Sequence, residues 1–264
     1  MALPIRLGVL RALVKEVSVS ARDEKPLVVG GARELAGVLR RELGRDARPG
    51  AIRAGDDPKG GAILVYVLGG KPSGDDEQAL KRARRARVPI VAVVTGSAAE
   101  DLSIPYVLAT DVVRVGAGTG FPLAEIARTI AGRLGEDAAP LAARVPLLRR
   151  AVANQLVAAF ARKNGIIGAA VFIPGADLPV IALNELRLLL RLEQAYGLEI
   201  GPQERLPEIV ATLGAGFGLR ALARQLLDLV PVAGWAVKGG VAYAGTRALG
   251  EAAIRRLEAA PGRH

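Results

Sequence analysis

The side chains on which most enzymes depend are nearly absent from this 264-residue chain. It has no cysteine, and its single histidine is the last residue, His264. Thiolate nucleophiles, disulfides, histidine general bases and zinc sites built from histidine or cysteine are therefore excluded. What remains is the chemistry of carboxylates and lysines, or phosphate binding by backbone amides. We predict no catalytic residue and no metal site.

The candidates for phosphate binding are Gly30 and Gly31, which follow the apolar run PLVV. A phosphate loop, G-x-x-x-x-G-K-[ST], cradles phosphates with its amides, while its lysine reaches the phosphates and its hydroxyl holds magnesium. Here the sequence reads GGARELAGVL, and Val38 and Leu39 follow Gly37 in place of the lysine and the hydroxyl. Gly30 and Gly31 stay weak nucleotide-binding candidates. A tight turn between a strand and a helix is the favoured alternative, so we predict no cofactor.

Two charged clusters have simpler explanations than catalysis. The acidic stretch SGDDE, residues 73–77, precedes an expected helix. Ser73 or Asp75 can cap the amino end of that helix, and acids in a first turn complement its dipole. The basic run KRARRAR, residues 81–87, predicts a solvated helix face. Metal binding by the first cluster and phosphate binding by the second are the alternatives.

Residues 26–137 alternate between apolar strands and helices. Strands are expected in residues 26–31, 62–70, 88–96 and 106–118, and helices in residues 32–43, 75–87 and 121–134. Continuous apolar strands that alternate with helices predict a mostly parallel sheet covered on both faces. The amino-terminal residues 1–25 form a separate segment. Its apolar residues at helical spacing predict an amphipathic helix that packs on the body, with a membrane-surface helix as the alternative: Leu7, Leu10, Leu13 and Val14.

Residues 138–264 are expected to be helical, and they begin with a basic region. No acidic residue occurs in residues 138–176, which contain Arg149, Arg150, Arg162 and Lys163. Basic side chains beside apolar surface suit anionic lipid headgroups. The longest run without a charge, residues 164–176, has 13 residues, whereas a membrane span needs about 20. We therefore expect these four cations to contact a membrane surface or a partner.

The stretch FIPGADLPVIALNELRLLLRLEQAYG, residues 172–197, predicts the turn and second helix of a helical hairpin. Asp177 stands where a helix N-cap belongs, and Pro179 lies in the first turn, where its missing amide costs nothing. Gly197 is expected to end the helix in the left-handed conformation. The packing stripe of this helix is Ile181, Leu188 and Leu192. Two further apolar helices rich in glycine are expected in residues 204–230 and 234–258.

Residues 26–134 resemble the Ras-like GTPase domain of the translation-factor and Era type. In that comparison VVGG stands at the first strand and phosphate loop. The stretch from AILVYVLGG to VVTG stands where that domain reaches its guanine-reading motif. The nucleotide motifs themselves are missing: no Asn-Lys-x-Asp occurs near TGSA, residues 95–98, and no Asp-x-x-Gly follows AIRAG. The resemblance therefore implies a degenerate GTPase-like domain.

The carboxyl-terminal half resembles the bacterial family catalogued as domain of unknown function 697 (DUF697). That family shows a Gly-Ala-Asp turn, a helix that closes in Tyr-Gly, and a Pro-x-x-Gly turn before a small-residue helix that carries a Leu-Gly pair. The matching residues here are Gly175, Ala176, Asp177, Tyr196, Gly197, Pro231, Gly234, Leu249 and Gly250. The resemblance implies an association with GTPase domains and with membranes.

Together these observations predict an α/β domain at residues 26–137 followed by an all-α helical-hairpin domain at residues 138–264. The net charge of +10 indicates an acidic partner. Aromatics make up only 3% of the chain, so nucleic acid is not the expected partner. We expect a non-enzymatic scaffold on the cytoplasmic side of the inner membrane, bound to anionic lipid or to a membrane protein, with a GTPase in trans or a homo-oligomer as further partners. The alternatives are a nucleotide-binding switch and a soluble oligomeric scaffold.

Overall fold

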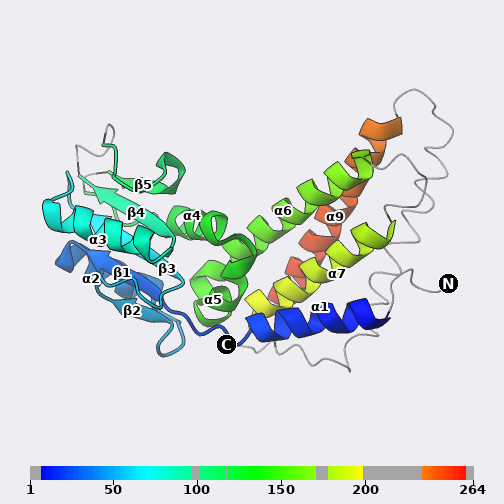
Figure 1. Cartoon of the computed structure of the whole chain (residues 1–264), viewed down its shortest axis with the longest axis horizontal. Helices are drawn as coiled ribbons and strands as arrows, with labels where there is room; N and C mark the ends of the chain where they lie inside the picture. The colour runs from blue at the N-terminus through cyan, green and yellow to red at the C-terminus, as the bar shows by residue number, and fades with distance from the viewer. Residues whose placement is uncertain (1–6, 97–101, 117, 171–177, 199–233, 260–264) are drawn as a thin grey trace. The chain divides into compact units, whose positions relative to one another are not determined.

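The computed structural model describes residues 7–96, 102–116, 118–170, 178–198 and 234–259. The chain divides into two compact units (Figure 1). Residues 22–152 form one, here called the sheet unit, while residues 1–21 and 153–264 form the other, the helical unit. The sequence placed the boundary after residue 137. It falls later because the short helices η2 (Gly135–Ala138), α5 (Ala139–Arg144) and η3 (Pro146–Leu148) pack with one another and with α4 (Leu123–Leu134).

The sheet unit contains five parallel strands in the order β2-β1-β3-β4-β5. The predicted parallel sheet is confirmed, and its four expected strands are β1 (Leu27–Gly31), β3 (Ile63–Leu68), β4 (Ile90–Thr95) and β5 (Val112–Val115). The short edge strand β2 (Ile52–Ala54) was not predicted. It has three residues, and its middle residue, Arg53, is exposed, so it lacks the apolar run that marks the others.

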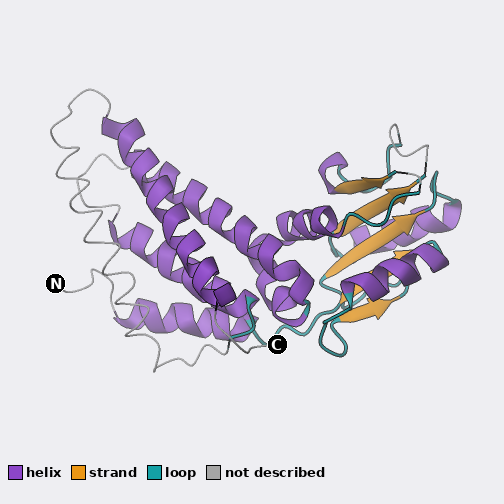
Figure 2. Ribbon diagram, turned by 180° about the vertical axis from the view of Figure 1, so that it is seen from behind, coloured by secondary structure: helices purple, strands orange, loops and turns teal. Residues whose placement is uncertain are grey.

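Helices cover both faces of the sheet (Figure 2). Helix α2 (Arg33–Leu43) links β1 to β2 in one direction across the sheet, and α3 (Gly74–Arg85) links β3 to β4 in the other. Because such crossovers are right-handed, the two helices lie on opposite faces. All six residues of β3 are buried, which explains its uninterrupted apolar sequence. On the α3 face, side chains from β1, β3 and β4 pack with the helix residues Ala79, Leu80 and Ala83.

The connection from β2 to β3 crosses β1 without a helix. The amide of Gly55 donates to the carbonyl of Val29 at 3.0 Å, and the amide of Ala62 donates to the carbonyl of Pro26 at 2.9 Å. Between these anchors, a Cβ added to Gly61 would lie 2.6 Å from a methyl group of Val28. Residues 55–62 therefore lie flat on β1, and Asp56 is brought beside the carboxyl end of that strand.

The helical unit is built on helix α7 (Leu178–Ala195), most of whose residues are buried. Helix α1 (Leu7–Ser20) runs parallel to it, because Glu16 pairs with Arg187 and Ser20 bonds Arg191 one turn later. The predicted packing of α1 on the body is confirmed: an apolar cluster joins the two helices and comprises Leu13, Val14, Val17, Leu186, Leu189 and Leu190.

Helix α9 (Gly234–Ala259) is parallel to α7 and antiparallel to α6 (Arg149–Ala170). Thr246 bonds Glu185 near the middle of α7, and Glu258 accepts from Tyr196 just past its end. Against α6 the order reverses: Gly239 lies against Gly165, and Gly250 lies against Val157. Figure 1 shows these helices side by side within the unit.

Four polar side chains meet in the core where α6, α7 and α9 touch. The amide of Asn184 donates to the Oδ1 of Asn164 at 2.7 Å, and the Nδ2 of Asn164 donates to Thr246 Oγ1 at 3.0 Å. The Thr246 hydroxyl in turn donates to Glu185 Oε1 at 2.8 Å. All four residues are buried. Buried polar groups are costly unless bonded, so this chain of bonds fixes how the three helices align.

Glycine at position 239 allows α6 and α9 to approach at backbone distance. A Cβ added to Gly239 would lie 2.8 Å from the carbonyl oxygen of Gly165 and 3.0 Å from the Cβ of Ala169, whereas one added to Gly240 meets nothing within 4 Å. We expect Gly239→Ala to lower the free energy of unfolding by about 1–3 kcal/mol. Gly240→Ala is the matched control and should raise it by roughly 0.5–1 kcal/mol, because alanine favours a helix. Urea unfolding of both variants tests this; equal effects would contradict the close approach.

Candidate functional site

The carboxyl ends of β1 and β3 are the first place to look for a ligand. In doubly wound sheets ligands bind where the strand order reverses, and here that point lies between β1 and β3. Gly31 ends β1, and α2 begins two residues later at Arg33. The chain therefore has no loop there that wraps around a phosphate. This junction is a tight turn between a strand and a helix, and it does not have the form of a phosphate loop.

Two backbone amides at this junction, those of Gly31 and Ala32, already have partners. The amide of Gly31 donates to the Oδ1 of Asp56 at 2.8 Å, and the amide of Ala32 donates to the carbonyl of Val67 at 2.8 Å. Gly31 has φ +98°, and a Cβ added to it would lie 2.0 Å from that same carbonyl oxygen. The carboxylate of Asp56 thus takes the Gly31 amide and lies against Gly30, so neither glycine offers a free face to a phosphate.

A second carboxylate, Asp76, lies at the same edge and holds the start of α3. Its Oδ2 accepts from the backbone amide and the hydroxyl of Ser73, and the Ser73 hydroxyl accepts from the Asp76 amide, which completes a capping box. The predicted capping role of Ser73 is confirmed. The hydroxyl of Tyr66, in β3, donates to the Oδ1 of Asp76 at 2.9 Å.

These contacts shift two pKa values in opposite directions. Burial and the neighbouring carboxylate raise the pKa of Tyr66 well above its ordinary value. Burial alone would raise the pKa of Asp76, but the hydrogen bonds from Ser73 and Tyr66 outweigh it and lower that pKa. Asp76 is therefore anionic at neutral pH. Together with Asp56 it gives this edge a negative charge, which repels phosphate.

The second place to examine is one end of the helical unit. Since α1, α7 and α9 are parallel and α6 is antiparallel to them, the first turns of α1, α7 and α9 and the last turns of α6 share one end. We call this the basic end: residues 7–15, 162–170, 178–184 and 234–246. These ranges contain no acidic residue and five basic ones: Arg11, Lys15, Arg162, Lys163 and Lys238.

The basic end also exposes large apolar side chains. Ile166 on α6 is 69% exposed, Val180 on α7 is 47% exposed, and Val9 on α1 is 42% exposed. Arg162 and Lys163 precede Ile166 by one turn and are themselves exposed. The Lys163 ammonium lies 5.8 Å from the centre of the buried Phe160 ring, so its stem follows the helix surface. Apolar side chains are therefore flanked by cations.

Two acids that lie away from the basic end pair with arginines. Glu16 pairs with Arg187 and with Arg191, the latter at 3.5 Å. Glu251 pairs with Arg247 at 2.8 Å. Acidic and basic side chains therefore pair away from the basic end, whereas every charged residue in the ranges of the basic end is a cation.

The four cations predicted to make contact do not form one cluster. Arg149 and Arg150 begin α6 and belong to the sheet unit, whereas Arg162 and Lys163 lie at the basic end. Sequence reasoning missed Arg11, Lys15 and Lys238, although the absence of acids from residues 1–15 was a usable signal.

The residues that carry the DUF697 resemblance have structural positions where they are described. Gly197 has φ +75° and ends α7, as predicted. A Cβ added to Gly250 would lie 2.4 Å from a methyl group of Val157, and the side chain of Leu249 packs on the α1–α7 cluster. Gly234 begins α9. The predicted turn residues Gly175, Ala176, Asp177 and Pro231, and the helix expected in residues 204–230, lie outside the described residues.

Three findings complete the description of the site. Among the described residues, no group of acids or histidine could hold a metal ion. No helix in the described ranges is both long enough and apolar enough to cross a bilayer. No protein-family model, curated protein or solved structure matches the chain.

We expect Asp76→Asn to lower the free energy of unfolding by roughly 1 kcal/mol at neutral pH, because it weakens the capping box and the bond from Tyr66. The folded-state pKa of Asp76 is lowered. Its stabilisation is therefore present above the ordinary aspartate pKa and is lost as the pH falls through the lowered one. The two proteins should converge in acid. Asp75→Asn, an exposed change in the same turn, is the control for urea unfolding across pH, and a gap that persists in acid would refute the assignment.

Proposed function

We propose that this protein is a non-enzymatic docking scaffold whose helical unit binds the anionic surface of a membrane through its basic end. The observation that carries the proposal is the combination found there: five cations, no acid, and three exposed apolar side chains on parallel and antiparallel helices that end together. Apolar side chains that enter a lipid interface, with cations at headgroup level, are what surface-bound helices use.

The magnitudes suit reversible binding. Each basic side chain near an anionic surface contributes about 1 kcal/mol, so the five together contribute about 5 kcal/mol. Full burial of one isoleucine or valine adds about 1.5–3 kcal/mol. A sum near 7 kcal/mol corresponds to a dissociation constant between about 1 μM and 1 mM. High salt should weaken the electrostatic part of the binding.

The family assignments are part of the same proposal. The helical unit would be a DUF697-type domain, and the sheet unit a degenerate GTPase-like domain. The resemblance of the sequence supports both. The carboxylates of Asp56 and Asp76 at the carboxyl edge of the sheet support the absence of nucleotide chemistry, because they stand where a phosphate would bind. The cytoplasmic side of the inner membrane would be its location, with a GTPase acting in trans as a possible partner.

The test is flotation of the purified protein with vesicles of phosphatidylcholine, with or without phosphatidylglycerol. We expect binding only to the anionic vesicles, and Arg162→Gln with Lys163→Gln should weaken it roughly 30-fold, the equivalent of about 2 kcal/mol. The matched control, Arg255→Gln with Arg256→Gln, removes two exposed cations from the last turns of α9 and should bind as the native protein does.

Two results would reject the proposal. The first is a native protein that does not float with anionic vesicles at low salt, which would favour a soluble scaffold. The second is an equal loss in both double variants, which would mean that net charge alone drives the binding.

A further inference from the structure

A second cationic surface lies in the sheet unit, where α3 ends. No acidic residue occurs in residues 78–96 or 102–110, and Glu100 and Asp101 lie outside the described residues. The second half of α3 and the chain just beyond it carry five exposed cations: Lys81, Arg82, Arg84, Arg85 and Arg87. None of these five side chains forms an ion pair with a described residue. The proposed membrane contact does not use them.

The loop between β4 and β5 packs against this end of α3. Ile104 is buried in the same apolar cluster as Ala83 of the helix, and Val107 packs on that cluster. The loop also exposes two large side chains: Tyr106 is 41% exposed, and Leu108, two residues later, is 58% exposed. Cationic and apolar side chains therefore occur together here.

A direct contact joins the helix to the loop. The guanidinium carbon of Arg84 lies 5.8 Å from the centre of the Tyr106 ring, within the range of a cation–π interaction. Both side chains are exposed, so the contact presents a cation and an aromatic ring side by side to the solvent.

Two residues of this surface adopt a backbone conformation that normally belongs to glycine. Among the described residues that are not glycine, only Arg87 and Tyr106 have a positive φ, of 56° and 67°. The amides of Arg87 and Val88 donate to the carbonyls of Arg84 and Ala83, a pair of bonds with which helices usually end on glycine. Tyr106 is the third residue of a turn closed by a bond from the amide of Val107 to the carbonyl of Ile104, where a positive φ again favours glycine.

The two strained positions belong to one surface. The carbonyl of Arg84 accepts from the amide of Arg87 at 3.1 Å, while its guanidinium lies over the Tyr106 ring. Glycine would adopt both conformations without steric cost, yet the chain has an arginine and a tyrosine there. Backbone strain of this kind persists where a particular side chain is needed for function.

We propose that this surface, formed by Arg84, Arg85, Arg87, Tyr106 and Leu108, binds an acidic segment of a partner protein that also carries apolar side chains. Arginine and tyrosine are enriched where proteins bind one another, and clusters of arginine recognise acidic motifs. An extended peptide presents its carboxylates one after another. Arginines that spread over a helix end therefore need not converge on a single anion.

The apolar part of the surface favours a peptide over nucleic acid. Single strands bind by stacking successive bases on several aromatic rings, whereas Tyr106 is the only aromatic among the exposed large hydrophobic side chains of the described residues. Leu108 suits an aliphatic side chain of a peptide. One helix end and one turn form a small interface, so the complex should be transient, and salt should weaken it.

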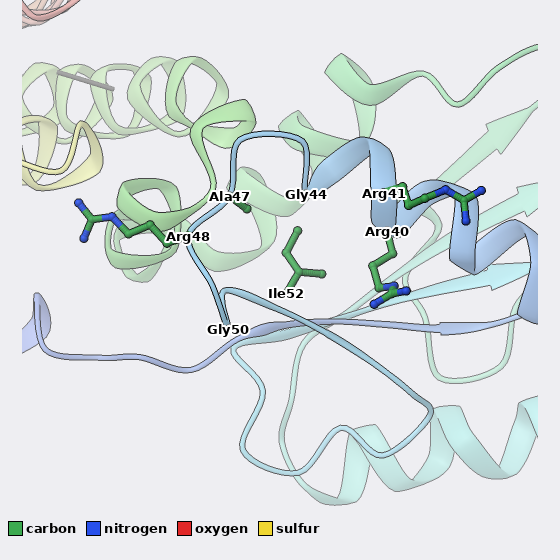
Figure 3. Close-up of a pocket in the computed structure, with 7 residues that line it drawn as sticks. All are labelled: Arg40, Arg41, Gly44, Ala47, Arg48, Gly50 and Ile52. Carbon is green, nitrogen blue, oxygen red and sulfur yellow. The ribbon is translucent and has the colours of Figure 1, made fainter. Parts of the chain in front are cut away.

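The end of α2, on the opposite face of the sheet, provides a matched control. Its last turn also carries two exposed arginines, Arg40 and Arg41. They line a shallow hollow of about 340 Å³, in which their side chains and that of Arg48 diverge around Ile52 (Figure 3). No exposed aromatic ring or leucine lines this hollow. If positive charge alone sufficed, an acidic peptide would bind both helix ends equally.

Fluorescence anisotropy with a fluorescein-labelled peptide of glutamates interrupted by two leucines tests the surface. We expect saturable binding by the native protein at low salt. Arg84→Gln with Arg85→Gln should weaken it about tenfold, whereas Arg40→Gln with Arg41→Gln should bind within about twofold of native. A peptide with serines in place of the leucines should bind about fivefold more weakly, because it lacks the apolar contact.

The strained arginine separates binding from folding. Arg87→Gly should raise the melting temperature by roughly 2–4 °C, because glycine relieves the strain, yet it should weaken peptide binding about fivefold. Leu108→Ser, an exposed change, should weaken binding to a similar extent and leave the melting temperature unchanged. An Arg87→Gly protein that is more stable and binds as the native protein does would contradict the inference.

Three further results would overturn the inference: no binding by the native protein, an equal loss in the two double arginine variants, or equal binding of the serine peptide. A labelled single-stranded oligonucleotide that binds more tightly than the peptide, and loses binding on Arg84→Gln with Arg85→Gln, would make this a nucleic-acid surface instead. Arg162→Gln with Lys163→Gln should leave peptide binding unchanged, so this inference and the membrane proposal can fail separately.

Discussion

The helical unit depends on the requirement that polar side chains buried on α7 be bonded. Asn184 and Glu185 contact α6 and α9 through Asn164 and Thr246, and Arg191 contacts α1 through Ser20. Leucine-rich helices pack about equally well in several alignments, because leucine fits many holes. A misaligned buried amide or carboxylate, however, costs about 1–3 kcal/mol for each lost partner. Two sets of hydrogen bonds, at different positions along α7, therefore determine the axial positions of α1, α6 and α9.

This alignment in turn creates the basic end. Cations on α1, α6 and α9 gather at one end only because α6 runs against the other three helices and each is held at a fixed height. Had α9 been reversed, Arg255 and Arg256 would lie with Ile166, and Lys238 would lie among the acids. The distribution of charge over the surface is thus a consequence of the polar bonds in the core. In the sheet unit, β1 lies between β2 and β3, and the strand order reverses between β1 and β3.

Much of the fold was predictable, for identifiable reasons. The strands β1, β3 and β4 are buried on both faces and therefore have uninterrupted apolar sequences. Helix α3 begins at a recognisable N-cap, Ser73. Strand β2 escaped prediction because a three-residue edge strand carries no periodic signal. On α7 the predicted stripe of Ile181, Leu188 and Leu192 is buried, but a stripe does not reveal that nearly the whole helix is enclosed.

The candidate sites were less predictable, because they depend on contacts between distant residues. The sequence identified Gly30 and Gly31 as places for an anion, but it does not show that Asp56, 25 residues later, occupies that place. It identified Arg162 and Lys163, but helix directions were needed to bring Arg11 and Lys238 to the same end. Nothing in the sequence indicated the role of Asn184, because its partner Asn164 lies 20 positions earlier in the chain. Thr246, which bonds Asn164 in turn, lies 82 positions after Asn164.

The helical unit is assembled from residues 1–21 and 153–264, with the whole sheet unit, residues 22–152, inserted between these two segments. During synthesis on the ribosome, α1 is made about 160 residues before its partner α7, a delay of roughly 10–30 s at common elongation rates. The sheet unit has all of its strands by then and is free to fold meanwhile. Until α7 is made, Leu13, Val14 and Val17 lack the α7 leucines that cover them in the folded protein. The nascent α1 therefore exposes its apolar face.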